Sequence, residues 1–307
     1  MRRTIAVGIF AAVALTACGG QTAAPGTTPT TDAPSADVST DRTFDTSAVQ
    51  KVDEIAGLVP TAVAERGTLL IGASADYAPA EFRADDLKTY IGYDVDLGRA
   101  LGKVLGLDAQ VQDAEFASLI PAIGTTTDVG ISSFTITAER MQAANMISYI
   151  TVGSSYAVKT GNPDQFDPDN VCGKPIAVQT GTWQADELAA FSQACTDAGN
   201  KAIEILSYAR QSDATTNVVG GKAAAFYADS TVAGYAAALT NGQLEVTGGI
   251  RDAAPQGIVV AKNDAELTEA MQKAMQHLMD DGTWKAILDS WGVEDAALTT
   301  AELNPSA

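Results

Sequence analysis

The chain is poor in histidine and in positive charge. It contains one histidine, His277, and 19 lysines and arginines against 38 aspartates and glutamates. The sequence therefore offers neither a histidine cluster for a metal nor a Ser-His-Asp set for nucleophilic catalysis, and we expect no cofactor and no enzymatic activity. The formal net charge of −19 at pH 7 argues against nucleic acid and against an anionic lipid surface as partners.

Long apolar runs are also scarce, and one stands at the start of the chain. Met1-Arg2-Arg3 is followed by the small, apolar stretch 4–17, which is shorter than the roughly 20 residues of a membrane-spanning helix. Leu15-Thr16-Ala17-Cys18 resembles the lipobox of bacterial lipoproteins, whose cysteine is acylated after cleavage. We therefore expect a signal peptide at residues 1–17 and a lipid anchor on Cys18. The alternative is an ordinary secretory signal followed by a chance cysteine.

Residues 18–50 have almost no large apolar side chains. Their threonine, alanine, proline, aspartate, serine and glycine cannot bury enough surface to offset the entropy of the chain. We expect a flexible tether that holds a folded body at the outer face of the cytoplasmic membrane.

Cysteine is rare, with three residues in the whole chain. If Cys18 carries lipid, Cys172 and Cys195 remain as an even pair in an exported protein, where a disulfide is the expected state. A metal site is the alternative, but His277 lies far away in the sequence and is expected on the surface of a helix. We therefore predict a disulfide between Cys172 and Cys195.

Strand-like and helix-like segments alternate along the rest of the chain. We expect strands at 68–72, 109–112, 128–132, 174–178, 203–206, 223–227 and 257–261, and helices at 47–65, 93–105, 116–123, 137–145, 183–198, 212–219, 231–239, 266–282 and 283–291. This order predicts an α/β protein with a mostly parallel sheet. Beyond residue 298 the chain is polar, and we expect it to be frayed.

Several stretches, in this order along the chain, resemble the bacterial extracellular solute-binding proteins of family 3. They are Asp76-Tyr77-Ala78-Pro79, Gly92-Tyr93-Asp94-Val95-Asp96-Leu97, Phe116-Ala117-Ser118-Leu119, Ser133-Phe134-Thr135-Ile136-Thr137-Ala138-Glu139-Arg140, Val178-Gln179-Thr180-Gly181-Thr182, Phe226-Tyr227-Ala228-Asp229-Ser230, Gly257-Ile258-Val259-Val260 and Asp281-Gly282-Thr283-Trp284. The resemblance covers residues 66 to 292.

The resemblance implies a periplasmic-binding-protein-like fold of type II, with two α/β lobes that close on a ligand. Lobe 1 would comprise residues 51–151 plus 255–307, and lobe 2 residues 152–254. The two hinge crossings would fall near 150–155 and 253–256. The implied function is that of a monomeric binding subunit, which captures a free polar amino acid and delivers it to the permease of an ABC importer.

Two charged residues suit the two charges of an amino acid. Arg140 follows the expected helix cap Thr137, and its planar guanidinium can hold a carboxylate in a bidentate manner, as the arginine of the family does. Asp229 follows an apolar strand and is expected to hold the ammonium group. A surface arginine paired with Glu139 and a simple helix-capping aspartate are the alternatives.

Further residues complete the expected site. Ser133 and Thr135 would supply polar partners beside Arg140, and the amide of Thr182 would hold the ligand carboxylate from the second lobe, in addition to a plain capping role. The aromatic walls are expected to be Tyr77, Phe116 and Trp183. Trp183 replaces the small residue usual in the family, so core packing remains its alternative.

Other positions also depart from the family pattern and bear on the ligand. Ala80 replaces a common aromatic residue. Ser74 stands where receptors for basic amino acids often carry an acidic residue, and Asp76 would partly restore the negative charge that is missing there.

A compatible solute or an opine on the same fold is the alternative ligand, because Trp183 with Tyr77 and Phe116 could begin an aromatic box for a quaternary ammonium group. A dehydratase-like enzyme is the remote alternative, with Asp229 and Glu81 as its candidate general acids.

Overall fold

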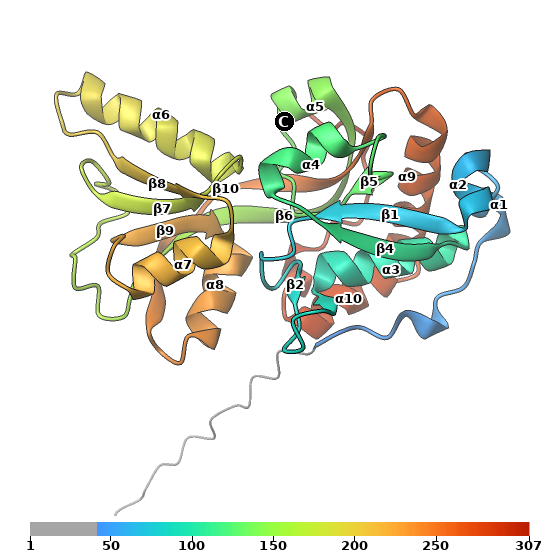
Figure 1. Ribbon diagram of the computed structural model, residues 1–307, viewed down its shortest axis with the longest axis horizontal. Helices are drawn as coiled ribbons and strands as arrows, with labels where there is room; N and C mark the ends of the chain where they lie inside the picture. The colour runs from blue at the N-terminus through green and yellow to red at the C-terminus, as the bar shows by residue number, and fades with distance from the viewer. Residues whose placement is uncertain (1–41, 307) are drawn as a thin grey trace, which may run out of the picture. The chain divides into compact units, whose positions relative to one another are not determined.

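The computed structural model describes residues 42–306 (Figure 1). The predicted signal peptide, the acylated Cys18 and most of the tether lie outside the described residues. Within residues 42–306, no helix combines the length and the apolar character that a membrane span requires.

Most of the predicted helices and strands are present, but the strands at 82–83, 90–91 and 144–159 were not predicted. The strands are β1 (Thr68–Ala73), β2 (Phe82–Arg83), β3 (Tyr90–Ile91), β4 (Asp108–Asp113), β5 (Val129–Gly130), β6 (Ala144–Lys159), β7 (Pro175–Gln179), β8 (Glu204–Tyr208), β9 (Ala225–Asp229) and β10 (Leu244–Ala261). The α-helices are α1 (Asp53–Ala56), α2 (Thr61–Arg66), α3 (Tyr93–Leu105), α4 (Phe116–Ala122), α5 (Ala138–Ala143), α6 (Trp183–Asp197), α7 (Gln211–Val219), α8 (Ser230–Leu239), α9 (Ala265–Asp280) and α10 (Thr283–Trp291). Short 3-10 turns occur at Thr46–Ala48 and Glu294–Ala296.

Two long antiparallel strands, β6 and β10, join two lobes. The larger sheet has the order β4-β1-β5-β10-β6-β9-β7-β8. Parallel strands β4, β1 and β5 lie on one side of the long pair, and β9, β7 and β8 lie on the other (Figure 1). The fold is therefore the two-lobed α/β architecture expected from the sequence. The segments in which the hinge crossings were expected are parts of β6 and β10.

Glycines allow α3 to pack closely in the first lobe. Gly92, which precedes the helix, has a φ of 128°, and a Cβ atom there would lie 2.1 Å from the carbonyl oxygen of Ala80. A Cβ atom on Gly98 would lie 2.6 Å from the side chain of Ile71 on β1. Only glycine fits these two positions without a shift of the neighbouring atoms. The helix itself runs over Tyr93–Leu105, as the hydrophobic spacing predicted.

The single helix predicted at 47–65 is wrong. The chain instead forms the turn Thr46–Ala48 and the short helices α1 and α2. Pro60 lies at the N-cap of α2. Because proline has no N–H group to continue a helix from the preceding turn, it separates the two helices.

The last residues of the predicted tether pack against the body. The amide of Phe44 donates to the carboxylate of Asp96 on α3 at 2.9 Å, and the Phe44 ring lies against the main apolar core. Phe44 is the one aromatic residue between 18 and 50. Phe44 is half-buried against this core, so the predicted tether does not extend as far as residue 50.

The frayed C-terminal end predicted beyond residue 298 is also wrong. Leu303 forms an isolated β-bridge with Ile147, and the Asn304 side chain accepts a hydrogen bond from the Met146 amide at 2.9 Å. Ala301 is buried. These contacts attach the end of the chain to β6. They are tertiary contacts, which the local polarity of the sequence does not predict.

Cys172 and Cys195 form the predicted disulfide, which links the loop before β7 to α6 in the second lobe. The two residues are separated by 23 positions. Cross-linking a loop of this length restricts the unfolded chain and stabilises the folded state by about 3 kcal/mol.

We expect the double variant Cys172→Ser, Cys195→Ser to lose about 3 kcal/mol of unfolding free energy, because its unfolded chain is less restricted. Urea denaturation of the protein, followed by far-UV circular dichroism, measures the change. Reduction of the wild-type protein serves as the control and should give the same midpoint as the double variant. Equal stability of oxidised, reduced and variant proteins would contradict a stabilising disulfide.

Candidate functional site

Side chains from both lobes line one small, enclosed cavity. Its lining consists of Tyr77, Phe116, Ser133, Thr135, Arg140, Gln179, Thr182, Trp183, Gln184 and Asp229. All of the ligand-binding residues predicted from the sequence are in this set. Gln179 and Gln184 were missed.

The chain brings these residues together at the ends of strands and the starts of helices. In the first lobe, Tyr77 follows β1, Phe116 begins α4, and Ser133 and Thr135 lie between β5 and α5. In the second lobe, Gln179 and Asp229 end parallel strands β7 and β9, and Trp183 begins α6. Carboxyl ends of parallel strands are the edge at which open α/β sheets commonly bind ligands.

Arg140 lies on α5, and its guanidinium reaches both lobes. Its Nη1 donates to the carbonyl of Thr135 at 2.8 Å, and its Nη2 donates across to the carbonyl of Gly181 at 3.0 Å. The guanidinium also lies 5.6 Å from the centre of the Phe116 ring. Burial lowers the pKa of Arg140 from its usual value, while nearby carboxylates oppose this effect. Within residues 42–306 this arginine forms no ion pair, so the predicted alternative of pairing with Glu139 is wrong.

Asp229 provides a buried negative charge on the opposite wall. Its side chain receives one hydrogen bond from Gln184 at 2.8 Å and one from Gln256 at 2.6 Å, and its backbone amide donates to the hydroxyl of Tyr77 at 3.1 Å. Burial raises the pKa of Asp229 to about 6, although the hydrogen bonds and the charge of Arg140 act to lower it. Although Asp229 occupies the N-cap position of α8, its carboxylate makes no capping hydrogen bond. The simple capping role is therefore excluded.

Thr182 and Ser133, which also line the cavity, are held by hydrogen bonds. The Thr182 hydroxyl accepts from the amide of Ala185, so Thr182 does cap α6. The first amide groups of a helix have no partner inside the helix, and they favour an anion. On the first lobe, the amide of Ser133 donates to Asp94 at 2.8 Å, which holds the Ser133 backbone at a φ of 49°.

Aromatic side chains complete the walls. The Phe116 ring stacks on Phe134 at 4.9 Å between centroids, which fixes the wall from behind. Trp183 is half-buried and lines the cavity, so the core-packing alternative for this residue is wrong. Its indole N–H is buried and has no hydrogen-bond acceptor among the described residues.

Three neighbouring polar residues considered in the sequence analysis do not add a carboxylate to the lining of this cavity. Ser74 is buried and accepts a hydrogen bond from Gln179 at 3.2 Å. Asp76 lines a second, larger cleft, and there its carboxylate accepts from the amide and hydroxyl of Ser212. Glu81 is fully buried against Ser132 and is not part of the cavity lining.

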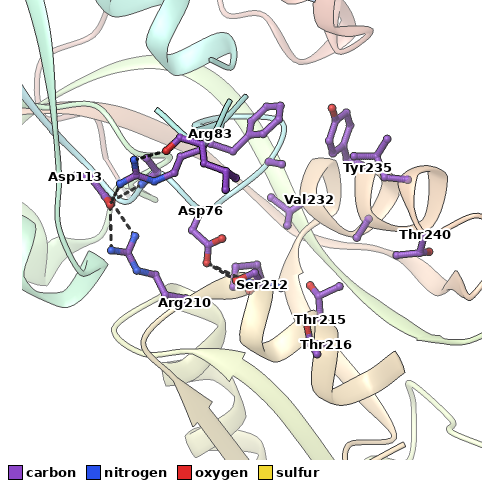
Figure 2. Close-up of a pocket in the computed structure, with 17 residues that line it drawn as sticks. Asp76, Arg83, Asp113, Arg210, Ser212, Thr215, Thr216, Val232, Tyr235 and Thr240 are labelled. Atoms are coloured by element: carbon purple, nitrogen blue, oxygen red, sulfur yellow. Dashed lines mark hydrogen bonds and ion pairs between the residues drawn. The ribbon is translucent and has the colours of Figure 1, made fainter. Parts of the chain in front are cut away.

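Polar contacts across the larger cleft tie the two lobes together (Figure 2). Asp113, at the end of β4, forms a bidentate ion pair with Arg210 of the second lobe at 2.8 and 3.1 Å. The same carboxylate also pairs with Arg83 of its own lobe at 2.8 Å. Because Arg210 belongs to one lobe and Asp113 to the other, this pair forms when the lobes are close.

The described part of the chain contains no group of three or more histidine, cysteine, aspartate or glutamate side chains placed to hold a metal ion. The cavity instead offers separated charges of opposite sign, polar groups and aromatic walls. These features suit the binding of a small dipolar molecule.

Comparison with known proteins places the chain in a family. Residues 69–294 match the bacterial extracellular solute-binding proteins, family 3. The chain belongs to this family. The arginine-binding protein ArgT of Corynebacterium glutamicum is 36% identical over 255 residues, which cover 82% of this chain and 83% of that protein.

Solved structures with the same fold are also amino-acid-binding proteins. A mutant of ArgBP from T. maritima has a TM-score of 0.68 and 29% identity, over 75% of this chain and 97% of that one. The ancestral amino acid-binding protein AncCDT-1, described as a precursor of cyclohexadienyl dehydratase, has a TM-score of 0.67 and 30% identity over the same shares. This family 3 protein is therefore a solute-binding protein, and its relatives are binding proteins.

The two residues that were missed differ in the signal they carry. Gln179 lies inside the stretch Val178-Gln179-Thr180-Gly181-Thr182 that supported the resemblance, so the motif itself pointed to it. Gln184 lies two residues after that stretch and is not part of any motif that supported the resemblance. Its role depends on contacts with residues far away in the sequence.

We expect Arg210→Gln to shift the ligand-free protein towards more open conformations, because it removes the ion pair between the lobes. For a partly exposed pair the effect is about 1 kcal/mol, or about fivefold in the ratio of open to closed molecules. Small-angle X-ray scattering measures the change as a larger radius of gyration. Arg83→Gln is the matched control, since it removes a partner of the same carboxylate within one lobe. Identical scattering from both variants would contradict a closing role for Arg210.

Proposed function

We propose that this family 3 protein captures a polar α-amino acid between its lobes and presents it to the permease of an ABC importer. One observation carries the proposal: Arg140 from one lobe and Asp229 from the other line the same enclosed cavity without pairing with each other. A zwitterion satisfies both charges. Neither charge otherwise has an ion-pair partner among the described residues, which is costly for a group removed from water.

The ligand carboxylate is expected to lie at Arg140 and at the start of α6. Arg140 has a planar set of N–H donors, and Thr182 lies at the N-cap of a helix whose end favours negative charge. The ammonium group would then lie at Asp229. Because these partners come from different lobes, an amino acid binds the closed protein better than the open one, and this difference drives closure.

The ligand side chain is set by the remaining walls. The relative from Corynebacterium glutamicum is arginine-binding and one from Escherichia coli is L-cystine-binding, which favours a polar side chain. Asp229 is the one carboxylate that lines the described cavity, and the proposed site uses it for the ammonium group. A cationic side chain would then depend on neutral acceptors such as Gln179 and on the aromatic faces of Tyr77 and Phe116.

A compatible solute with a quaternary ammonium group is the second candidate, because Tyr77, Phe116 and Trp183 all line the cavity. An aromatic wall attracts such a cation. However, a quaternary ammonium group has no N–H donor for the Asp229 carboxylate, whose position between Gln184 and Gln256 suits hydrogen bonding. A primary ammonium group therefore fits this wall better.

Catalysis is less well supported than binding. The relationship to AncCDT-1, a binding protein described as a precursor of a dehydratase, makes a related enzyme conceivable. A dehydratase needs a general acid in contact with its substrate. Glu81 does not line the cavity, and the Asp229 carboxylate is the acid that the ammonium group would occupy.

The proposed location of the protein follows from its sequence. The lipobox-like stretch ending in Cys18 and the polar segment after it support a lipid anchor and a tether at the outer face of the cytoplasmic membrane. A binding subunit held there would remain close to its permease.

We expect Arg140→Ala and Asp229→Asn each to weaken amino-acid binding by about 3 kcal/mol or more, a factor of at least about a hundred. Each substitution leaves one charge of the ligand without its partner in a closed site. Isothermal titration calorimetry measures the loss. Arg66→Ala is the control, since Arg66 pairs with Asp128 outside the cavity. Wild-type affinity in both site variants, with unchanged thermal unfolding, would refute the assignment.

The side chain of the ligand is tested by comparing close analogues. We expect polar α-amino acids to raise the unfolding temperature with increasing concentration, because a ligand at about 100 times its Kd stabilises by about 2.7 kcal/mol. L-arginine and L-citrulline differ in the charge of the side chain, and glycine betaine carries the quaternary ammonium group of the second candidate. Stabilisation by glycine betaine and by none of the amino acids would overturn the amino-acid proposal.

A further inference from the structure

Two carboxamide side chains hold the Asp229 carboxylate from opposite sides. The Nε2 of Gln184 donates to Oδ1 at 2.8 Å, and the Nε2 of Gln256 donates to Oδ2 at 2.6 Å. All three side chains are almost completely buried, with 2% of Gln184, 1% of Gln256 and 3% of Asp229 exposed. The three residues come from three different elements, α6, β10 and β9.

We propose that Gln184 and Gln256 are positioning residues, which fix the orientation and the charge of Asp229 for the ammonium group of the ligand. This inference rests on the proposed function, because Asp229 is the residue assigned to the ammonium group.

The hydrogen bonds leave the carboxylate oriented and still able to accept. Each carboxylate oxygen can accept two hydrogen bonds and receives one from a glutamine, so each keeps the capacity to accept another. The second N–H of Gln184 donates to the hydroxyl of Ser154 at 2.9 Å. Ser154 lies on β6 opposite Asp229 on β9, so Gln184 is fixed to the same pair of strands as the carboxylate.

The two ends of the Gln256 carboxamide have different surroundings. Because its amide nitrogen bonds to Asp229, its carbonyl oxygen is directed away from that carboxylate. This oxygen is buried and has no hydrogen-bond donor among residues 42–306. A buried acceptor without a donor is costly. Because Gln256 does not line the cavity, its amide acts on a ligand only through Asp229.

The surroundings of Asp229 make the two glutamines important for its charge. Burial raises the pKa of Asp229, and the hydrogen bonds from Gln256 and Gln184 lower it, followed by the charge of Arg140. The Tyr77 hydroxyl accepts from its backbone amide and also lowers its pKa through a hydrogen bond, and Glu81 and Tyr93 are the other titratable groups that interact with it. Loss of a donor removes an interaction that favours the ionised form, so the pKa must rise.

Only the ionised carboxylate attracts an ammonium group, so affinity falls as the pH drops through the pKa of Asp229. In the wild-type protein that pKa is about 6. A variant without one of the amide donors should lose affinity at a higher pH than the wild type.

The direct test follows the Asp229 carboxyl carbon by ¹³C NMR during a pH titration of the full-length, ligand-free protein, with Asp229→Asn identifying the signal. We expect Gln184→Met to raise the midpoint by about one pH unit, since methionine has a similar length and no N–H donor. Gln193→Met is the matched control. Gln193 lies on the same helix and also donates to a carboxylate, that of Asp197, at an exposed position. Its variant should titrate like the wild type.

The affinity for L-arginine, measured by calorimetry between pH 5 and 8, provides a second readout. We expect its decline at low pH to shift upward in Gln184→Met by the same amount as the NMR midpoint. Should Gln184→Met fail to fold, Gln256→Met gives the same comparison. An unchanged Asp229 midpoint in a folded glutamine variant would overturn the inference. Retention of amino-acid binding by Asp229→Asn would instead overturn the proposed function, whatever the NMR titration shows.

Discussion

The structure depends on keeping two charges of opposite sign, the half-buried Arg140 and the buried Asp229, in one cavity without an ion pair between them. Arg140 and Asp229 line the same space, yet the described residues contain no ion pair between them. A buried charge needs compensation. The protein provides it with neutral dipoles: backbone carbonyls of Thr135 and Gly181 for the guanidinium, and the amides of Gln184 and Gln256 for the carboxylate. Both charges therefore remain available to a ligand.

The two-lobed fold makes this separation possible. Arg140 belongs to the lobe of β1 and Asp229 to the lobe of β9, so the distance between them changes when the lobes move. The long strands β6 and β10 are the connection between the lobes, and Gln256 on β10 contacts Asp229. The ion pair of Arg210 with Asp113 adds a contact between the lobes outside the cavity. Closure thus combines ligand-dependent and ligand-independent contacts.

Local sequence patterns predicted most of the elements and the lining of the cavity. The helix Tyr93–Leu105 followed from its apolar spacing, and motifs around Arg140, Thr182 and Asp229 pointed to residues that the fold brings together. In each case the signal lies within a few consecutive residues. The capping roles proposed for Thr137 and Thr182 also depend on neighbours three residues away.

The predictions from the sequence were wrong where contacts between residues far apart in the chain determine the structure. The chain end is ordered by β6, about 150 residues earlier, through contacts such as that of Asn304 with Met146. The composition predicted that residues 42–50 belong to the tether, although Phe44 packs against the core. Asp76 is near the cavity in sequence but is directed to the other cleft by Ser212. No local pattern identifies Gln184 or Gln256, because their importance comes from Asp229.

The central claim is that the two charges bind the two ends of one amino acid. A crystal structure of the protein with its tightest-binding amino acid tests it most directly. The claim predicts the ligand carboxylate within hydrogen-bonding distance of Arg140, and the ligand ammonium within hydrogen-bonding distance of Asp229. A ligand bound in the cleft lined by Asp76 and Arg210, or one whose charged groups contact neither Arg140 nor Asp229, would contradict it.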